Sequence, residues 1–152
     1  MSEPVITDFA LPSTGNVTFK LSDHRGKHVV VYFYPKDNTP GCTVEGQEFR
    51  DLYPKFQQAN AVVVGVSRDS LKSHENFKST QGFPFELLSD TEGTLCERFG
   101  VMKLKNLYGK QVRGIERSTF VFDAKGNLVK SWRGLKAPGH AAEVLEFVQT
   151  LN

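Results

Sequence analysis

The stretch YFYPKDNTPGCTVEGQEF, residues 32–49, decides the fold because it begins as a buried strand and ends as an amphipathic helix. Residues 29–34, VVVYFY, are β-branched or aromatic throughout, which is typical of a strand covered on both faces. After Thr43, apolar residues recur at intervals of three and four and predict one buried helix face: Phe49, Leu52, Tyr53 and Phe56. Pro54 is expected to kink or locally interrupt this helix. One of only two cysteines, Cys42, lies at the joint between strand and helix.

The rest of the chain continues the alternation of strands and helices. Strands are expected within 4–21 (around a turn at 13–16), 61–66, 85–88, 119–122 and 128–132, the last two as a hairpin, and helices over 70–80, 91–99 and 141–151. This order predicts an α/β fold with a mixed central β-sheet flanked by helices, in the thioredoxin-like arrangement. With 152 residues, 39% of them hydrophobic, the chain is expected to form a single domain over residues 1–152.

Composition narrows the possible partners and compartments. The net charge of +2 comes from 19 basic and 17 acidic residues scattered along the chain, so no nucleic acid is expected as a partner. No run of about 20 apolar residues and no basic, apolar leader is present, which predicts no membrane span, no secretory signal and a cytoplasmic protein. In the cytoplasm cysteine thiols are mostly kept reduced. No glycine-rich nucleotide motif and no paired C-x2-C zinc motif occurs, so we expect no cofactor and no metal.

Two interpretations of Cys42 are possible: a reactive cysteine or a buried structural one. The first turn of a helix carries unpaired N–H groups and the positive end of the helix dipole, and such settings can lower a cysteine pKa from roughly 8.5 to about 3.5–7.5. Thr39 could cap the helix or hydrogen-bond a ligand above the sulfur, and Glu45, one turn on, could orient a cation or oppose ionisation. Cysteine is otherwise among the most buried residue types. The Pro/Thr/Pro/Gly-shaped loop before Cys42 favours the reactive reading.

The histidines and the aromatic residues can be explained without a role in catalysis. His24, His28 and His74 are expected to be solvent-exposed, and His140 to lie near the start of the last helix. A cysteine protease would need a histidine beside Cys42, but no local protease signature surrounds it, and the absence of C-x-x-C argues against a dithiol oxidoreductase. The aromatic residues most simply fill the core. Some of them, including Phe33, could instead wall a pocket near Cys42.

The pattern P-x-x-x-T-x-x-C, formed by Pro35, Thr39 and Cys42, resembles the peroxiredoxins. Further blocks in the same order, FYPKDNTPGCTVEGQEFRDL, GVSRDS, FPFELLSD, RSTFVFDAKG and GHAAEVLEF, resemble the bacterioferritin comigratory protein, or Q-type, subgroup over nearly the whole chain. The resemblance implies that Cys42 attacks a peroxide as thiolate and becomes a sulfenic acid, that Thr39 hydrogen-bonds the peroxide, and that Pro35 shields the site. Arg117 matches the family arginine, whose charge would stabilise the thiolate and the developing anion.

In one respect this chain differs from many members of the subgroup that it resembles. Many Q-type members carry a second, resolving cysteine five residues after the first, where this chain has Gln47. Cys96 is the other candidate resolver, although its place beside Leu95 and three residues before Phe99 also suits the core. A disulfide with Cys42 would need Cα atoms within about 7 Å. We therefore expect a one-cysteine cycle in which an external thiol reduces the sulfenic acid.

Two functions from different classes remain open on the sequence alone. The first is a thiol-dependent peroxidase that reduces hydrogen peroxide and organic hydroperoxides, with thioredoxin, glutaredoxin or a low-molecular-weight thiol as reductant. The second is a redox sensor or binding module switched by oxidation of Cys42. The resemblance further implies a monomer.

Overall fold

A computed structural model describes residues 8–152, apart from the side chain of Leu107. The strands are β1 (Ala10–Ser13), β2 (Val17–Lys20), β3 (His28–Phe33), β4 (Ala61–Ser67), β5 (Glu86–Ser89), β6 (Met102–Leu107), β7 (Lys110–Ile115), β8 (Ser118–Phe122) and β9 (Leu128–Arg133). The helices are the 3-10 helix η1 (Leu21–His24), α1 (Pro40–Gln58), α2 (Leu71–Gln81), α3 (Thr94–Arg98) and α4 (His140–Gln149).

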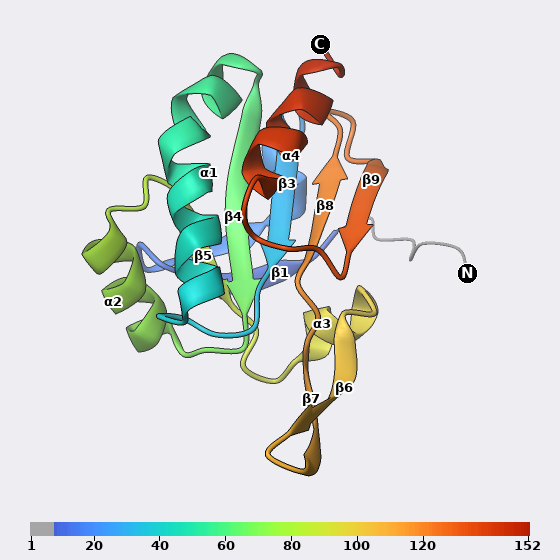
Figure 1. Cartoon of the computed structure of the whole chain (residues 1–152). Coiled ribbons are helices and arrows are strands. Elements are labelled where there is room, and N and C mark those ends of the chain that lie inside the picture. Colours follow the sequence, from blue (N-terminus) through green and yellow to red (C-terminus); the bar gives the residue numbers. More distant parts are fainter. Residues whose placement is uncertain (1–7) are drawn as a thin grey trace.

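Seven strands form one mixed sheet in the order β2-β1-β5-β4-β3-β8-β9. The central strands β3, β4 and β5 run parallel, as their strand–helix–strand connections require, while β8 and β9 continue the sheet antiparallel beyond β3. In Figure 1, α1 and α4 lie side by side in front of this sheet. The predicted α/β architecture, with a mixed central sheet flanked by helices, is confirmed.

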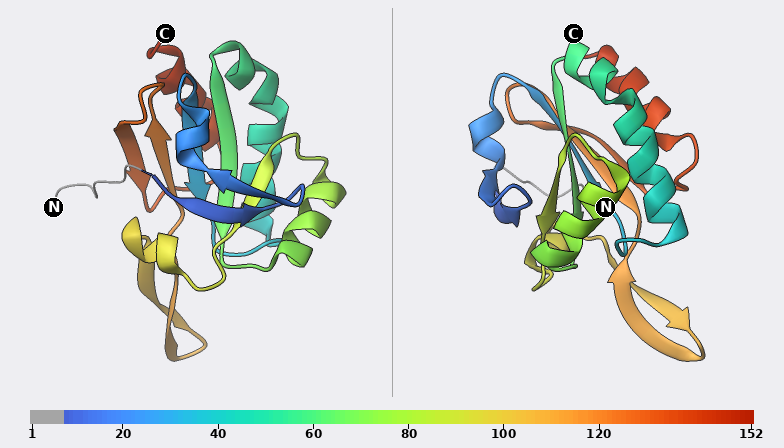
Figure 2. Two further views of the ribbon diagram at one scale, coloured as in Figure 1. Left: turned by 180° about the vertical axis from the view of Figure 1, so that it is seen from behind. Right: turned by 90° about the vertical axis from the view of Figure 1, so that its left-hand side faces the viewer.

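The sheet separates two hydrophobic clusters, as expected for strands buried on both faces. Alternate residues of β3 divide between them: Val30 and Tyr32 belong to a cluster shared with α1, α2 and α4, whereas Val31 and Phe33 belong to one shared with α3 and η1. Figure 2 shows η1 on the side of the sheet away from α1 and α4. Since Cys42 packs in the first cluster and Phe33 in the second, the idea that Phe33 walls the pocket is wrong.

The predicted elements are present with shifted boundaries. Helix α1 already begins at Pro40 and continues through Pro54, which removes one backbone donor without ending the helix. Helix α3 covers only Thr94–Arg98 of the expected 91–99, because Gly93 before it adopts a left-handed conformation (φ 75°). Strand prediction within 4–21 is met by β1 and β2, and its first residues, 4–7, lie outside the described part of the chain.

The hairpin formed by β6 and β7 was not predicted. It pairs Met102 with Ile115 and Leu107 with Lys110, and Figure 1 shows it projecting from the body of the molecule. The two-residue turn, Tyr108 and Gly109, has positive φ at both positions (54° and 78°), as two-residue hairpin loops favour.

The histidines require corrections. His74 and His28 are buried rather than solvent-exposed, and His24 is half-buried, stacked on the ring of Phe19 with centroids 4.6 Å apart. His74 shares the inner face of α2 with Phe77, three residues later, while His28 opens the buried strand β3. His140 begins α4, as expected. Among the described helices, none is long and apolar enough to cross a membrane.

Candidate functional site

Cys42 lies in the first turn of α1, at the carboxyl end of the central strand β3. Thr39 has an extended conformation (φ −94°, ψ 153°) and stands just before the helix, and Pro40, whose ring presets a helical φ, occupies the first helical position. The first intrahelical bond runs from the Thr43 N–H to the Thr39 carbonyl, 2.9 Å. Cys42 is only 2% exposed, so its sulfur lies largely out of bulk water, and its position in the first turn places it near the unpaired N–H groups of the helix.

Arg117 brings a positive charge to this sulfur. It lies between β7 and β8, directly before the strand that pairs with β3. Its Nη2 donates to Cys42 Sγ at 3.4 Å, while Nη1 donates to Glu45 Oε1 at 2.7 Å. Burial alone would lower the pKa of Arg117, but the charges of Glu45 and Cys42 raise it above its usual value. The guanidinium therefore stays charged, and its planar fork joins the thiol to a carboxylate.

Glu45 is the buried anchor of that fork. Its side chain has no exposed surface, and Oε2 has no hydrogen-bond partner among the described residues. Burial raises the pKa of Glu45 to about 7, although the charge and hydrogen bond of Arg117 act in the opposite direction. Of the two readings that the sequence left open, orienting a cation is the one that this ion pair realises.

Gly41 leaves room for the guanidinium. A Cβ atom at this position would lie 2.9 Å from Arg117 Nη2, closer than a real Cβ atom comes to a neighbouring side chain. Any other residue at position 41 would therefore push Arg117 away from the sulfur. The glycine before Cys42 is required by this close approach and not by an unusual φ angle.

Thr39 and Pro35 belong to the loop that joins β3 to α1. The Thr39 side chain does not cap the helix. Its hydroxyl instead donates to the Lys36 carbonyl at 2.7 Å, which leaves the oxygen's remaining lone-pair capacity free to accept a hydrogen bond. Pro35 is half-buried immediately after β3. The structure thus brings Cys42, Arg117 and Glu45 into one contact chain, with Thr39 three residues before the sulfur.

Cys96 is not brought to this site. It is fully buried in α3, within the hydrophobic cluster on the opposite face of the sheet from Cys42. Burial, together with the neighbouring Asp90 carboxylate, raises the pKa of its thiol far above the usual value, so it is a poor nucleophile. Gln47, at the position of the missing local thiol, donates to Gln81 Oε1 in α2 at 2.9 Å.

Lys105 is a neighbour of the site that the sequence did not indicate, because the hairpin carrying it was not predicted. Its ammonium donates to the Ile115 carbonyl at 2.6 Å, two residues before Arg117. Burial lowers the pKa of Lys105, and the charge of Arg117 lowers it further, whereas the charge of Cys42 raises it. Lys105 is therefore near enough for its charge to interact with those of Arg117 and Cys42.

A groove of about 590 Å³ between β9 and α4, lined in part by Trp132, His140 and Phe147, is a separate feature. None of the candidate catalytic residues lines it. The ring of His140, which lines this groove, is hydrogen-bonded through Nε2 to Thr119 Oγ1 at 2.9 Å. We therefore base the functional argument on the surroundings of Cys42.

Known proteins are similar to this chain in sequence and in fold. Residues 4–131 match the AhpC/TSA family. The peroxiredoxin Bcp of Xanthomonas campestris pv. campestris is 53% identical over 138 residues, which cover 91% of this chain and 86% of that protein. The peroxiredoxin Bcp of Bacillus subtilis is 48% identical over 145 residues, which cover 95% and 92% of the two chains.

A solved structure extends the likeness to three dimensions. It is a trapped intermediate or ligand complex of the Xanthomonas campestris bacterioferritin comigratory protein, described as giving insight into alkyl peroxide reduction. It aligns with a TM-score of 0.89 and 50% identity over 93% of this chain and 90% of its own. The chain therefore belongs to the AhpC/TSA family and is a peroxiredoxin of the bacterioferritin comigratory protein, or Q-type, subgroup, an enzyme that reduces a peroxide at the expense of a thiol.

Proposed function

We propose that Cys42 is the peroxidatic residue of this enzyme. The observation that carries the proposal is the 3.4 Å contact between Cys42 Sγ and Arg117 Nη2 at the N-terminal turn of α1. In the first step the thiolate attacks one oxygen of the peroxide and the O–O bond breaks. The sulfur is oxidised to a sulfenic acid, and the other oxygen leaves with a proton as water or an alcohol.

Arg117 and Thr39 act on the charge and the position of the reacting atoms. The Arg117 guanidinium favours the thiolate over the thiol and stabilises the negative charge that grows on the leaving oxygen. The Thr39 hydroxyl, whose hydrogen points to Lys36, accepts a hydrogen bond from the hydroperoxide O–H. This bond would hold the peroxide with its O–O axis toward the sulfur.

Glu45 and Pro35 support this arrangement. Glu45 holds the second arm of the Arg117 fork, so that the first arm points at Cys42 rather than at solvent. Pro35 has no N–H and covers the site from the end of β3, where it limits access of water to the sulfenic acid. Neither residue takes part in bond making.

The sulfenic acid is reduced by an external thiol in a one-cysteine cycle. The attacking thiol forms a mixed disulfide with Cys42 and releases water, and a second thiol then regenerates Cys42 and carries away the disulfide. The burial of Cys96 on the opposite face of the sheet supports this route, because a Cys42–Cys96 bond would require a large rearrangement. Candidate reductants are thioredoxin, glutaredoxin and a low-molecular-weight thiol.

We propose a monomer that works in the cytoplasm as a single domain over residues 1–152. Every proposed catalytic residue comes from one chain, so a second copy is not needed to complete the site. A reduced Cys42 is needed at the start of each turnover, and the cytoplasm keeps thiols reduced. The cysteine-protease alternative loses its support, since the polar partner of the Cys42 sulfur is an arginine and a protease nucleophile pairs with a base.

The test is peroxide consumption by the purified protein with dithiothreitol or thioredoxin, compared with Cys42→Ser and Cys96→Ser. We expect sustained turnover that Cys42→Ser abolishes and Cys96→Ser keeps. Full turnover by Cys42→Ser would refute the site. A single oxidation without turnover would instead favour the redox sensor.

Intact mass after one equivalent of peroxide tests the cycle. We expect the gain of one oxygen atom. An intramolecular Cys42–Cys96 disulfide as the main product would overturn the one-cysteine route.

A further inference from the structure

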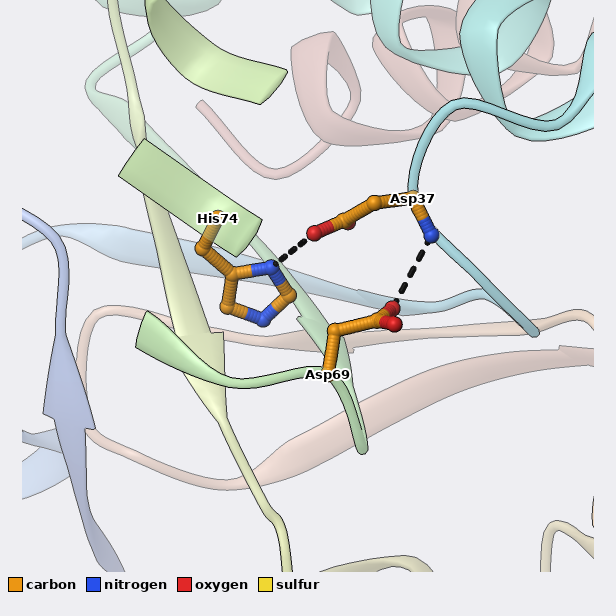
Figure 3. A group of neighbouring side chains, drawn as sticks. All are labelled: Asp37, Asp69 and His74. Carbon is orange, nitrogen blue, oxygen red and sulfur yellow. Dashed lines mark hydrogen bonds and ion pairs between the residues drawn. The ribbon is translucent and has the colours of Figure 1, made fainter. Parts of the chain in front are cut away.

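The loop that leads to Cys42 meets the loop after β4 and the first turn of α2, and their side chains form a buried polar cluster. Asp37 follows β3, Asp69 follows β4, and His74 projects from α2 toward both (Figure 3). These are the carboxyl ends of adjacent parallel strands, the edge at which α/β folds place their sites. Asp37 and His74 are almost completely buried.

Asp37 is the centre of this cluster. Its Oδ1 accepts from the Tyr34 hydroxyl at 2.6 Å, and its Oδ2 accepts from Ser73 Oγ and faces His74 Nδ1, both at 2.7 Å. Its own backbone N–H donates to Asp69 Oδ2 at 2.9 Å, and Ser67 Oγ donates to that same carboxylate oxygen at 2.6 Å. One residue of the loop is thus fixed through its side chain and its backbone.

The hydrogen-bond partners of His74 and Asp37 indicate how the two side chains interact. His74 Nε2 lies 2.9 Å from the Leu88 carbonyl, which can only accept, and Nδ1 faces the Asp37 carboxylate. Both ring nitrogens of His74 therefore face acceptors. Burial would raise the pKa of Asp37, but hydrogen bonds from His74 and Tyr34 hold it below its ordinary value. The pair is a buried ion pair with satisfied partners.

The residue types would also suit a metal ion. Here, however, the lone pairs of Asp37 that face the cluster already receive hydrogen bonds from Tyr34, Ser73 and His74, so the network is complete without one. Ion pairs at such depth add little net stability compared with apolar packing, and their best-supported use is to specify one conformation. The question is then which conformation Asp37 specifies.

The answer lies in the next residues of the loop. Thr39 Oγ1 is held by the carbonyl of Lys36, the residue directly before Asp37. Asn38, directly after Asp37, has a positive φ of 61°, a conformation that non-glycine residues seldom adopt. Fixing Asp37 on both sides therefore sets the direction of the Lys36 carbonyl and, through it, of the Thr39 hydroxyl.

We propose that Asp37, held by His74, is a positioning residue of the peroxidase reaction: it fixes the loop from Pro35 to Gly41 so that the Thr39 hydroxyl faces the peroxide above Cys42. This inference rests on the proposed function. It concerns residues that do not touch substrate and act only through the loop. Breaking the Asp37–His74 pair should therefore slow the reaction of Cys42 with peroxide. It should not slow the reaction of Cys42 with reagents that do not need the Thr39 hydroxyl.

The experiment compares two reactions of the same sulfur in Asp37→Asn and His74→Gln. Rapid mixing gives the rate constant with hydrogen peroxide, and alkylation by iodoacetamide reports an accessible thiolate without needing an oriented O–O bond. We expect the peroxide rate constant to fall by up to about 100-fold, the scale of a misplaced reacting group, while alkylation stays close to wild type. The double variant should lose no more than the larger single loss, because both changes break one pair.

His28→Gln is the matched control. His28 is also buried and hydrogen-bonded, to Asn152 Oδ1 at 3.2 Å, but it lies at the amino end of β3, away from the loop. Its replacement should lower stability without changing the ratio of the two rate constants. If Asp37→Asn does not fold, Ser73→Ala, which removes one donor from Asp37, decides by the same ratio.

Two results would overturn the proposal: an unchanged peroxide rate constant in the folded variants, or equal losses in the peroxide and alkylation reactions. Failure of the proposed function is distinguishable, because it would appear in the wild type as peroxide consumption that does not depend on Cys42.

Discussion

Replacing Arg117 by glutamine removes the charge beside Cys42 while keeping a polar side chain of moderate length. At the 3.4 Å separation of Nη2 and Sγ, a pair of unit charges is worth about 5 kcal/mol at an effective dielectric constant of 20 and about 1 kcal/mol in water. The Arg117 side chain is 15% exposed and shares its charge with Glu45, so the effect lies between these limits. Loss of one preorganised donor in other enzymes costs about 2.7–4 kcal/mol, which falls in the same range.

We therefore expect Arg117→Gln to lower the second-order rate constant for hydrogen peroxide by about 100- to 1,000-fold. The assay is rapid mixing of reduced enzyme with excess peroxide, followed by the loss of the Cys42 thiol. Arg117→Lys should recover only part of the rate, because an ammonium cannot span Cys42 and Glu45 with a planar fork. A rate constant for Arg117→Gln equal to that of the wild type would refute the electrostatic reasoning.

Stability gives a second, independent readout of the same change. Arg117→Gln leaves the Glu45 carboxylate buried without its cation, and breaking a buried pair in this way costs about 3–5 kcal/mol when the remaining group stays charged. Since the pKa of Glu45 is already about 7, the carboxylate escapes part of this cost by taking up a proton, and the loss should be smaller at pH 6 than at pH 8. Adding Glu45→Gln should restore stability but not the peroxide rate.

Three further predictions concern single groups of the site. Burial raises the pKa of Glu45 from 4.5 to about 7, so the native state keeps a proton that the unfolded state releases. The free energy of unfolding measured by urea titration should then fall by up to about 3 kcal/mol between about pH 4.5 and 7, and Glu45→Gln should flatten that slope. Gly41→Ala should slow the peroxide reaction by displacing the Arg117 guanidinium from Cys42, and thermal stability should be equal or lower, because the gain of up to about 1 kcal/mol from alanine in a helix is opposed by a weakened ion pair with Glu45; unchanged kinetics would show that the guanidinium tolerates the methyl group. Thr39→Val should lower the peroxide rate with the far-ultraviolet circular dichroism unchanged, and Thr39→Ser should retain most of the rate, whereas equal rates for the two would remove the hydroxyl from the reaction.

Periodicity predicted the parts of the fold that are buried in a regular way. Strand β3 reads as a continuous apolar run because both of its faces are covered, and α1 as a three–four pattern because one face is. The hairpin β6–β7 escaped the same reasoning because only its base, at Met102 and Ile115, packs against the core, while Leu104 and Val112 farther out are exposed, so no regular apolar pattern marks its strands. The signal that could have found it was the turn pair Tyr108-Gly109 between two alternating runs.

Local pattern also fails where a polar residue is buried by partners distant in sequence. His74 looked exposed because α2 has few apolar residues, although its spacing from Phe77 places both on the inner face. Its burial is compensated by Asp37, 37 residues away, and by the Leu88 carbonyl. No property of the helix alone encodes those contacts. Arg117 could be assigned to the site only by resemblance, since its partners are 72 and 75 residues away.

The enclosure of Cys42 sets opposite demands on the two halves of the cycle. A sulfur in a residue only 2% exposed suits a small peroxide, which must be oriented by Thr39 and Arg117 and shielded from water. A thiol carried by a protein must bring its own sulfur onto that of Cys42 and needs a wider opening. Gly41 and the first turn of α1 would have to move for this, but the Asp37 network resists movement of the loop before it. Because Cys96 lies beyond the sheet, the chain has no internal thiol that avoids the conflict. The rigidity that favours reaction with peroxide should therefore slow reduction by a protein thiol more than reduction by a small one.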